Sequence, residues 1–155
     1  MMKKQFVTFV ATGAWSGLIP WVPGTFGTMP AWLIAFFLIK GSILWMTAAA
    51  VVTLFISAWA AGEAEKQFGH DARKIVIDEW AGMFVALIFV PFSLTNYLIA
   101  FVAFRFFDVV KLPPASQWEK LPGGWGVTMD DIAAGVHANI ITQVIALVMR
   151  VYFTG

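Results

Sequence analysis

The chain of 155 residues contains no cysteine. It therefore cannot use disulfides, thiolate metal ligands, a cysteine nucleophile or an S-acyl anchor. Charge is also scarce, because 12% of the residues are Asp, Glu, Lys or Arg, whereas a soluble domain usually has about 25%. Ten basic and nine acidic residues leave a net charge of +1. This balance provides no basic patch, so we expect no nucleic-acid partner.

Apolar residues are present in excess. They make up 60% of the sequence and give a mean hydropathy of +0.80. A soluble domain is usually about 45–50% apolar, so a chain of this composition would lack the polar surface that contact with water requires. The length suits one domain, and we expect residues 1–155 to form a single unit embedded in a membrane.

Long apolar runs predict membrane helices. The run 43–61 has no charge and is close to the ~20 residues that cross a ~30 Å hydrocarbon core, and a second run covers 132–153. The runs 29–39 and 80–107 are shorter, since a turn at 91–96 divides the latter into two helices. Alternating segments typical of strand barrels are missing. We predict an all-α polytopic membrane protein, a compact bundle of about five to six helices of which several are short or half-spanning.

Threading these helices through a bilayer gathers the polar loops 16–28, 62–77 and 108–130 at one face. The loop face carries Lys66, Arg73, Lys74, Arg105, Lys111 and Lys120, and the opposite face carries Lys40 and Arg150. An excess of Lys and Arg marks the cytoplasmic side of a membrane protein. We therefore expect a multi-pass protein whose polar loops face the cytoplasm.

Five carboxylates lie where these loops meet helices. They are Asp78, Glu79, Asp108, Asp130 and Asp131. A carboxylate at the centre of a bilayer costs ~2.5–3.5 kcal/mol or more, so converging acids need a function or a positive partner. Oxygen ligands of this kind suit Mg2+, which prefers carboxylates together with substrate phosphate. Asp78 and Asp130 are placed equally well to cap helices, and that alternative stays open for each of them.

Arg105, Asp108 and Lys111 are spaced by three residues and so are expected to share one helix face. They could form a self-contained string of ion pairs. Alternatively, Asp108 binds metal while one or both of Arg105 and Lys111 bind phosphate oxygens. The glycine-containing segment 20–28 precedes a predicted helix start, which is a favourable place for an anion. We therefore include among the predicted phosphate ligands Thr25, Gly27 and Thr28.

Four sequence blocks, in order, resemble the phosphatidylglycerophosphatase A family. The blocks are GLIPWVPGTFGT at 17–28, IVIDEWAGM at 75–83, FRFFDVVK at 104–111 and LPGGWGVTMDDIAAG at 121–135. The resemblance covers nearly the whole chain from Gly17 to about Ala138. It implies an enzyme of the bacterial inner membrane that uses Mg2+ to remove phosphate from phosphatidylglycerophosphate, giving phosphatidylglycerol. By position, the acidic motif residues of the family correspond to the five carboxylates named above, with Arg105 and Lys111 beside them.

The residues also narrow the mechanism. There is no cysteine, no Asp-x-Asp pair and no Ser-Gly-His element, so three covalent routes of phosphate hydrolysis are excluded. Metal-assisted attack by water remains, with Glu79 or Asp131 as the base. The substrate would be a phospholipid in the bilayer, and no obligate protein partner is inferred. The competing hypothesis is a small ion or proton pathway lined by carboxylates, but the acids cluster at one face instead of stepping across the membrane.

Overall fold

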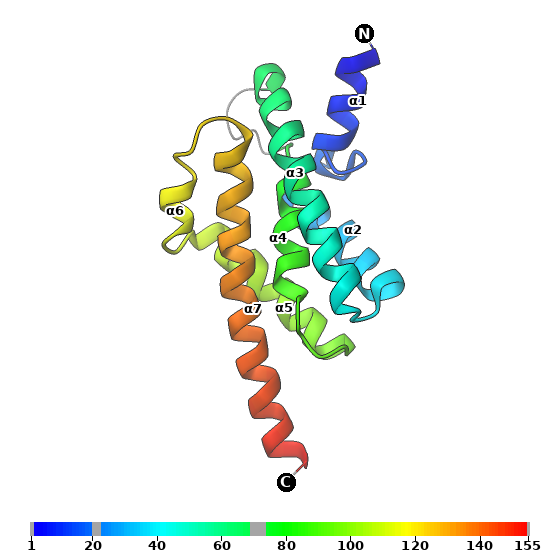
Figure 1. Cartoon of the computed structure of the whole chain (residues 1–155), viewed down its shortest axis with the longest axis vertical. Coiled ribbons are helices and arrows are strands. Elements are labelled where there is room, and N and C mark those ends of the chain that lie inside the picture. Colours follow the sequence, from blue (N-terminus) through cyan, green and yellow to red (C-terminus); the bar gives the residue numbers. More distant parts are fainter. Residues whose placement is uncertain (1, 20–22, 69–73, 155) are drawn as a thin grey trace.

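The structure is a computed structural model that describes residues 2–19, 23–68 and 74–154 (Figure 1). Every regular element in these ranges is helical, as predicted. The α-helices are α1 (Met2–Ala11), α2 (Pro23–Ile34), α3 (Ile43–Phe68), α4 (Ile77–Leu87), α5 (Leu94–Val110), α6 (Ala115–Trp118) and α7 (Gly124–Thr154). A 3-10 turn, η1 (Ser16–Leu18), follows α1, and a π-helical turn, η2 (Ala35–Ile39), ends α2. The all-α prediction is confirmed for the described residues.

Two helices are long and apolar enough to cross a membrane. These are α3, with 26 residues, and the stretch Gly124–Tyr152 of α7. Only 28% of the most apolar part of each helix is buried within the bundle, so most of these apolar side chains face outward. A core helix of a soluble protein would instead be mostly buried. Extended apolar outer surfaces of this kind indicate contact with lipid, as expected for a membrane bundle.

Both long helices extend further than the apolar runs predicted. α3 continues past Ala61 to Phe68, and α7 begins at Gly124 instead of Ile132. The early start of α7 depends on close packing against α3, because a Cβ atom added at Gly124 would lie 2.2 Å from the carbonyl oxygen of Ala58. Glycine has a low helix propensity, but only glycine leaves room for this contact, so the packing favours it at the start of α7.

The extended α7 rules out one of the alternatives for the acids. Asp130 is the seventh residue of α7, so it does not cap the helix. The N-cap residue of α4 is Val76, and Asp78 lies in the first helical turn, where its Oδ1 accepts a hydrogen bond of 3.0 Å from the backbone N–H of Glu79. The interpretation of Asp78 and Asp130 as N-caps is therefore wrong.

The segment predicted to be a loop before the helix at 29–39 is itself largely helical. α2 begins at Pro23, and proline is favoured at the first helical position because its missing N–H is not needed there. Thr25, Gly27 and Thr28 consequently lie in the first two turns of α2. Residues 20–22 of this segment, and Arg73 of the following loop, lie outside the described residues.

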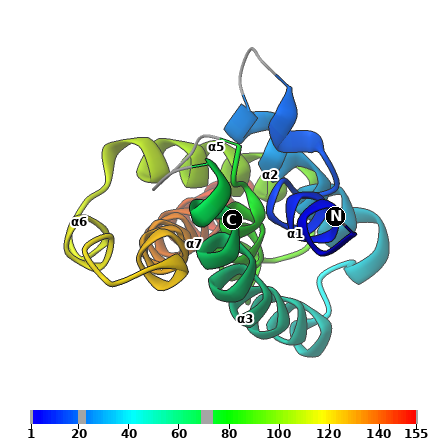
Figure 2. The ribbon, with the colours of Figure 1, turned by 90° about the horizontal axis from the view of Figure 1, so that it is seen from above.

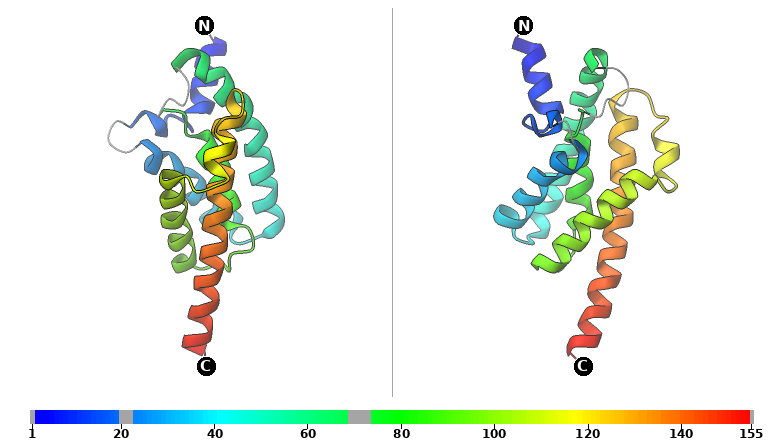
Figure 3. Two further views of the ribbon diagram at one scale, coloured as in Figure 1. Left: turned by 90° about the vertical axis from the view of Figure 1, so that its left-hand side faces the viewer. Right: turned by 180° about the vertical axis from the view of Figure 1, so that it is seen from behind.

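α4 is the central helix of the bundle. It packs against α2, α3, α5 and α7, and nine of its 11 residues are buried. At ~1.5 Å rise per residue it is only ~17 Å long, so it is the half-spanning first arm of the predicted hairpin, and α5 is the second arm. Seen from above, α2, α3, α5 and α7 surround the middle of the bundle, with α6 at its margin (Figure 2). α7 extends well beyond its neighbours toward the C-terminus (Figure 3).

Two glycines allow α4 and α7 to touch backbone to backbone. A Cβ atom at Gly82 would lie 2.6 Å from the carbonyl oxygen of Asp131, and one at Gly135 would lie 2.4 Å from the carbonyl oxygen of Gly82. Small residues permit this kind of close helix crossing in membranes. Gly82 follows Asp78 by four residues, and Gly135 follows Asp131 by four. Because four residues are about one helical turn, the crossing sets both acids on neighbouring turns of the two helices.

Candidate active site

The five predicted carboxylates converge near the N-terminal ends of α4 and α7 and the C-terminal end of α5. We call them the acid cluster: Asp78, Glu79, Asp108, Asp130 and Asp131. Asp131 lies within electrostatic range of the other four. Each of the four acids from α4 and α7 is less than a tenth exposed, and Asp108 has 19% of its side chain exposed. The fold therefore assembles residues from three helices that are far apart in the sequence.

Arg105 joins the acids of α4 and α5. Its Nη1 atom lies 3.1 Å from Oε2 of Glu79 and 2.7 Å from Oδ2 of Asp108. The Thr28 hydroxyl hydrogen-bonds to the same Oε2 of Glu79 and lies 3.4 Å from Nη1 of Arg105. Hydrogen bonds to charged partners are roughly twice as strong as neutral ones, so this group holds α2, α4 and α5 together at the site.

Gly24 provides the space for this group. A Cβ atom at position 24 would lie 2.3 Å from Nη2 of Arg105 and 2.8 Å from Oε1 of Glu79. A side chain there would displace the guanidinium group. Gly24 was not among the residues predicted for the site, although it lies in the block at 17–28. The sequence indicates only that this motif contains glycines. It does not indicate which residue of the folded protein packs against each of them.

The three predicted phosphate ligands of α2 have different surroundings. Thr28 is buried and directed at the acid cluster through Glu79. Gly27 instead serves packing, because a Cβ atom there would lie 2.5 Å from Cβ of Val76, and its carbonyl accepts a 2.8 Å hydrogen bond from the indole of Trp80. Thr25 is half-buried in the first turn of α2. Of the three, Thr28 has a described hydrogen bond to an acid.

Lys111 does not lie on the helix face that its spacing from Arg105 and Asp108 predicted. It forms the C-cap of α5 in a left-handed conformation with φ of 48°, which is uncommon for residues other than glycine. Its Nζ atom lies 2.7 Å from Oδ2 of Asp130 and 2.8 Å from Oε1 of Glu119. The predicted string of Arg105, Asp108 and Lys111 is therefore wrong in its last member, because the helix ends before Lys111 and the side chain turns to α7.

The surroundings of Lys111 keep it charged. Burial by itself lowers the pKa of a lysine. The hydrogen bonds that Lys111 donates to Asp130 and Glu119, together with the charges of both acids, outweigh burial and raise the pKa of Lys111 above its usual value. Glu119 was not among the predicted site residues. No spacing rule connects it to Lys111, because the intervening turn and α6 decide where its side chain lies.

The acid cluster has more carboxyl groups than cationic partners. Arg105 and Lys111 pair with three of the five acids, and neither Asp78 nor Asp131 forms an ion pair with a described Lys or Arg. Oδ1 of Asp130 is buried and has no hydrogen-bond partner among the described residues. Unpaired buried carboxylates are costly. Five oxygen-ligand side chains of this kind have the chemistry that a hard divalent cation requires.

The arrangement of the acids is not that of a formed metal centre. Within the described ranges, no three His, Cys, Asp or Glu side chains are placed so that they could hold a metal ion together. Arg105 and Lys111 take up carboxylate oxygens instead. The donor set thus fits Mg2+ in its chemistry, and the role of the acids as metal ligands stays a prediction.

Comparison with known proteins agrees with the resemblance in the four blocks. The sequence model of the phosphatidylglycerophosphatase A family matches residues 9–146. A protein of Bacteroides thetaiotaomicron named "Putative phosphatidylinositol-3-phosphatase" is 38% identical over 93% of this chain and 96% of its own length. Phosphatidylglycerophosphatase A of Haemophilus influenzae is 33% identical over 87% of this chain and 85% of its own length.

A further relative is phosphatidylglycerophosphatase A of Escherichia coli strain K12. It is 36% identical over 82% of this chain and 76% of its own length. No solved structure gives a significant match. The residues matched by the family model include the acid cluster, Arg105, Lys111 and both glycines of the crossing between α4 and α7. The chain therefore belongs to the phosphatidylglycerophosphatase A family.

Proposed function

We propose that this protein is a lipid phosphatase that removes the terminal phosphate of phosphatidylglycerophosphate, giving phosphatidylglycerol and inorganic phosphate. One observation carries the proposal: five largely buried carboxyl groups and two basic residues form one group within an apolar helical bundle. Such a group suits a charged head group whose acyl chains stay in the bilayer. The names of the two relatives from Haemophilus influenzae and Escherichia coli support this substrate.

In this proposal the acid cluster holds Mg2+, and Arg105 and Lys111 bind phosphate oxygens. A bound divalent cation neutralises phosphate charge and makes a water molecule more acidic. Arg105 offers the planar donors that match phosphate geometry, and Lys111 supplies a compact charge. Both side chains are already held by carboxylates, so they are oriented before substrate arrives.

Asp131 is the better of the two candidates for the base. Oε2 of Glu79 already contacts Arg105 and Thr28, whereas Asp131 has no ion pair or side-chain hydrogen bond with a described residue. Asp131 therefore takes the proton of the attacking water. The oxygen of this water forms the new bond to phosphorus, and the bond from phosphorus to the glycerol oxygen breaks. The glycerol oxygen takes up a proton from solvent, and Asp131 afterwards releases its own proton to solvent.

Phosphate release from purified protein in detergent tests the activity. We expect release from short-chain phosphatidylglycerophosphate to stop with EDTA and to return when Mg2+ is added, because the acid cluster lacks enough cations without a metal. Release that continues in EDTA would contradict the metal requirement. Release from neither this lipid nor phosphatidylinositol 3-phosphate would reject the phosphatase, and cation or proton flux into liposomes would then test the transport alternative.

The inositol lipid is included because the relative from Bacteroides thetaiotaomicron has that head group in its name. Both lipids present a phosphate monoester to the acid cluster, so the site chemistry does not separate them. Comparison of kcat/KM for the two lipids decides which of them is the preferred substrate. We expect the higher value for phosphatidylglycerophosphate, and a higher value for the inositol lipid would reassign the substrate.

We further propose a location in the bacterial inner membrane with the acid cluster facing the cytoplasm, supported by the distribution of Lys and Arg. The natural absence of cysteine permits a direct test with single cysteines at Ser116, which is exposed in α6, and Ser42, in the turn before α3. In intact spheroplasts an impermeant maleimide should label Ser42→Cys. It should label Ser116→Cys only after the membrane is permeabilised. The reverse pattern, or equal labelling of both, would contradict this orientation.

A further inference from the structure

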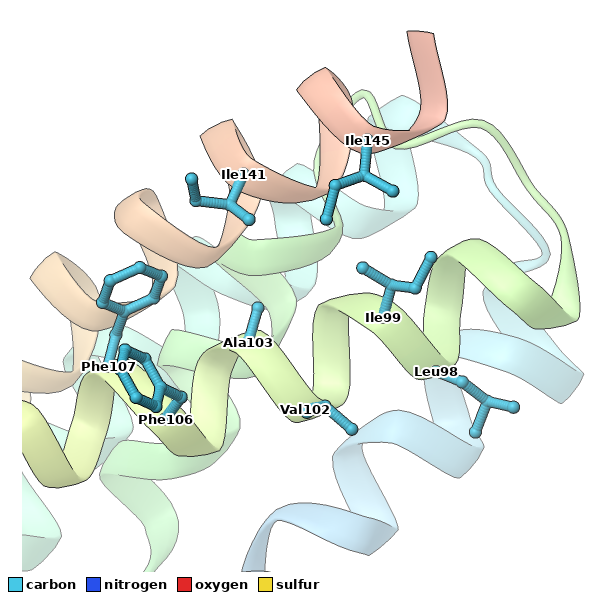
Figure 4. Close-up of a pocket in the computed structure, with 8 residues that line it drawn as sticks. All are labelled: Leu98, Ile99, Val102, Ala103, Phe106, Phe107, Ile141 and Ile145. Atoms are coloured by element: carbon cyan, nitrogen blue, oxygen red, sulfur yellow. The ribbon is translucent and has the colours of Figure 1, made fainter. Parts of the chain in front are cut away.

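An apolar groove of about 550 Å3 lies between α5 and α7 (Figure 4). Six side chains of α5 and two of α7 line it, and all eight are apolar. Ile99, Ala103 and Phe107 lie along the α5 wall, and Ile141 and Ile145 face them from α7 (Figure 4). The groove is thus an apolar channel on the outer surface of the bundle.

The groove leads to the acid cluster along α7. Asp130, His137, Ile141 and Ile145 follow one another by seven, four and four residues, so they share one face of the helix. Nδ1 of His137 lies 2.8 Å from the carbonyl oxygen of Ala133, which fixes its ring on this face. One continuous stripe of α7 therefore runs from the apolar groove to an acid.

The α5 wall leads to the same place. Ala103, Phe107 and Lys111 follow one another by four residues. The ring of Phe107 lies 5.3 Å from the ring of His137, measured between centroids, and Lys111 pairs with Asp130 at 2.7 Å. The two walls therefore meet at the end of the groove, in this ring contact, and again beyond it, in the ion pair that belongs to the site.

The length of the groove matches one leaflet of a bilayer. Its α5 wall extends from Leu98 to Phe107, nine residues apart, which at ~1.5 Å rise per residue is ~14 Å. Half of a ~30 Å hydrocarbon core is ~15 Å. Because α5 is inclined to α7 (Figure 3), this length is not a depth in the bilayer, but it is enough to accommodate a large part of one acyl chain.

We propose that this groove binds one acyl chain of the phospholipid substrate and so brings its phosphate head group to the edge of the acid cluster at Asp130, beside Lys111. The occupant is an acyl chain because the apolar groove leads to the cationic side chain of Lys111, which Asp130 and Glu119 hold at the edge of the site. This inference rests on the proposed phosphatase function. It adds a specificity site that lies outside the acid cluster.

Filling the groove tests the proposal. Ile141→Trp places a large side chain in the channel, and Ala103→Phe does the same from the opposite wall, in case the first variant folds poorly. We expect kcat/KM for dioleoyl phosphatidylglycerophosphate to fall about tenfold, equivalent to ~1.4 kcal/mol. The loss is limited because bilayer lipid is as apolar as the groove. The deacylated head group, glycerophosphoglycerol phosphate, has no chain to place, so its rate should stay unchanged.

A matched control lies on the other side of the bundle. Val52 is exposed on α3 and lines a second apolar groove, of about 510 Å3, beside η2. Val52→Trp should leave both rates unchanged. Equal losses in Val52→Trp and Ile141→Trp would mean that general lipid contact matters and not this groove. Equal losses on both substrates in Ile141→Trp would place its effect in the fold or the acid cluster, and the acyl-chain site would be rejected.

Photo-crosslinking gives a readout that does not depend on turnover. A phosphatidylglycerophosphate with a diazirine on one acyl chain should label peptides of α5 and α7, and excess unlabelled substrate should compete while phosphatidylethanolamine should not. Competition by both lipids would identify the occupant as bulk lipid, and crosslinks between two protein chains would identify a second copy. Either result overturns the proposal. A wild-type protein that hydrolyses neither substrate would instead reject the phosphatase function itself.

Discussion

Asp131→Asn is expected to abolish phosphate release while the helical bundle stays folded. Asp131 is 4% exposed and lies within electrostatic range of four other carboxylates. Asparagine keeps the shape of the side chain but can neither take a proton nor supply a charge to a cation. A general base contributes about 10²–10⁴-fold to a rate, so kcat should fall by at least this range, and more if Asp131 also holds the metal.

The stability of the same variant distinguishes a functional acid from a structural one. Asparagine removes one of several like charges, which repel one another when no metal is bound. In EDTA, Asp131→Asn should therefore unfold at the same temperature as the wild type or a higher one. Glu63→Gln is the matched control, since Glu63 pairs with Lys66 on α3, outside the acid cluster, and it should keep normal activity. A lower unfolding temperature with retained activity would remove Asp131 from the proposed mechanism.

Gly135→Ala is expected to lower both stability and activity. The added Cβ atom would lie 2.4 Å from the carbonyl oxygen of Gly82, so α4 and α7 must move apart. Overpacking of this kind costs about 1–3 kcal/mol in free energy of unfolding. Asp78 and Asp131 lie one turn from the contact, and a misplacement of ~1 Å in an active site can cost about 10²-fold in rate.

The sign of the change in stability distinguishes a glycine that is needed for packing from one that is not. Alanine is the better helix former by about 1 kcal/mol, so a glycine without a packing role would be stabilised by the substitution. Val136→Leu adds volume at the neighbouring residue, which is exposed, and should change neither stability nor rate. Denaturant unfolding in detergent and kcat for the lipid substrate give the two readouts. A stabilised, fully active Gly135→Ala protein would show that the close helix crossing is dispensable.

The glycine crossing and the group around Arg105 have related roles at the site. The crossing sets the distance between α4 and α7, while Arg105 of α5 links its helix to α4 through Glu79. Three helices are thus fixed relative to one another by contacts beside the acids or within them. Preorganised charges of this kind are effective because little reorganisation is needed when the substrate binds.

The sequence by itself determined the class of the protein and most of the residues of its site. The excess of apolar residues and the runs at 43–61 and 132–153 predicted membrane helices, because hydropathy is a local property that a window of about 20 residues contains. The order of four short blocks indicated the family. The same blocks contain the five acids, and a residue in a sequence motif can be identified without knowing where it lies in the fold.

Only the tertiary structure decided how those residues meet. α7 begins early because Gly124 packs on the backbone of α3, and this contact involves residues far apart in sequence. Lys111 pairs with Asp130 and Glu119 because α5 ends at a left-handed residue, although helical spacing had assigned it to Asp108. Periodicity describes one helix at a time, whereas charge pairing and close backbone contact depend on the distances between helices, which the packing of the whole bundle sets.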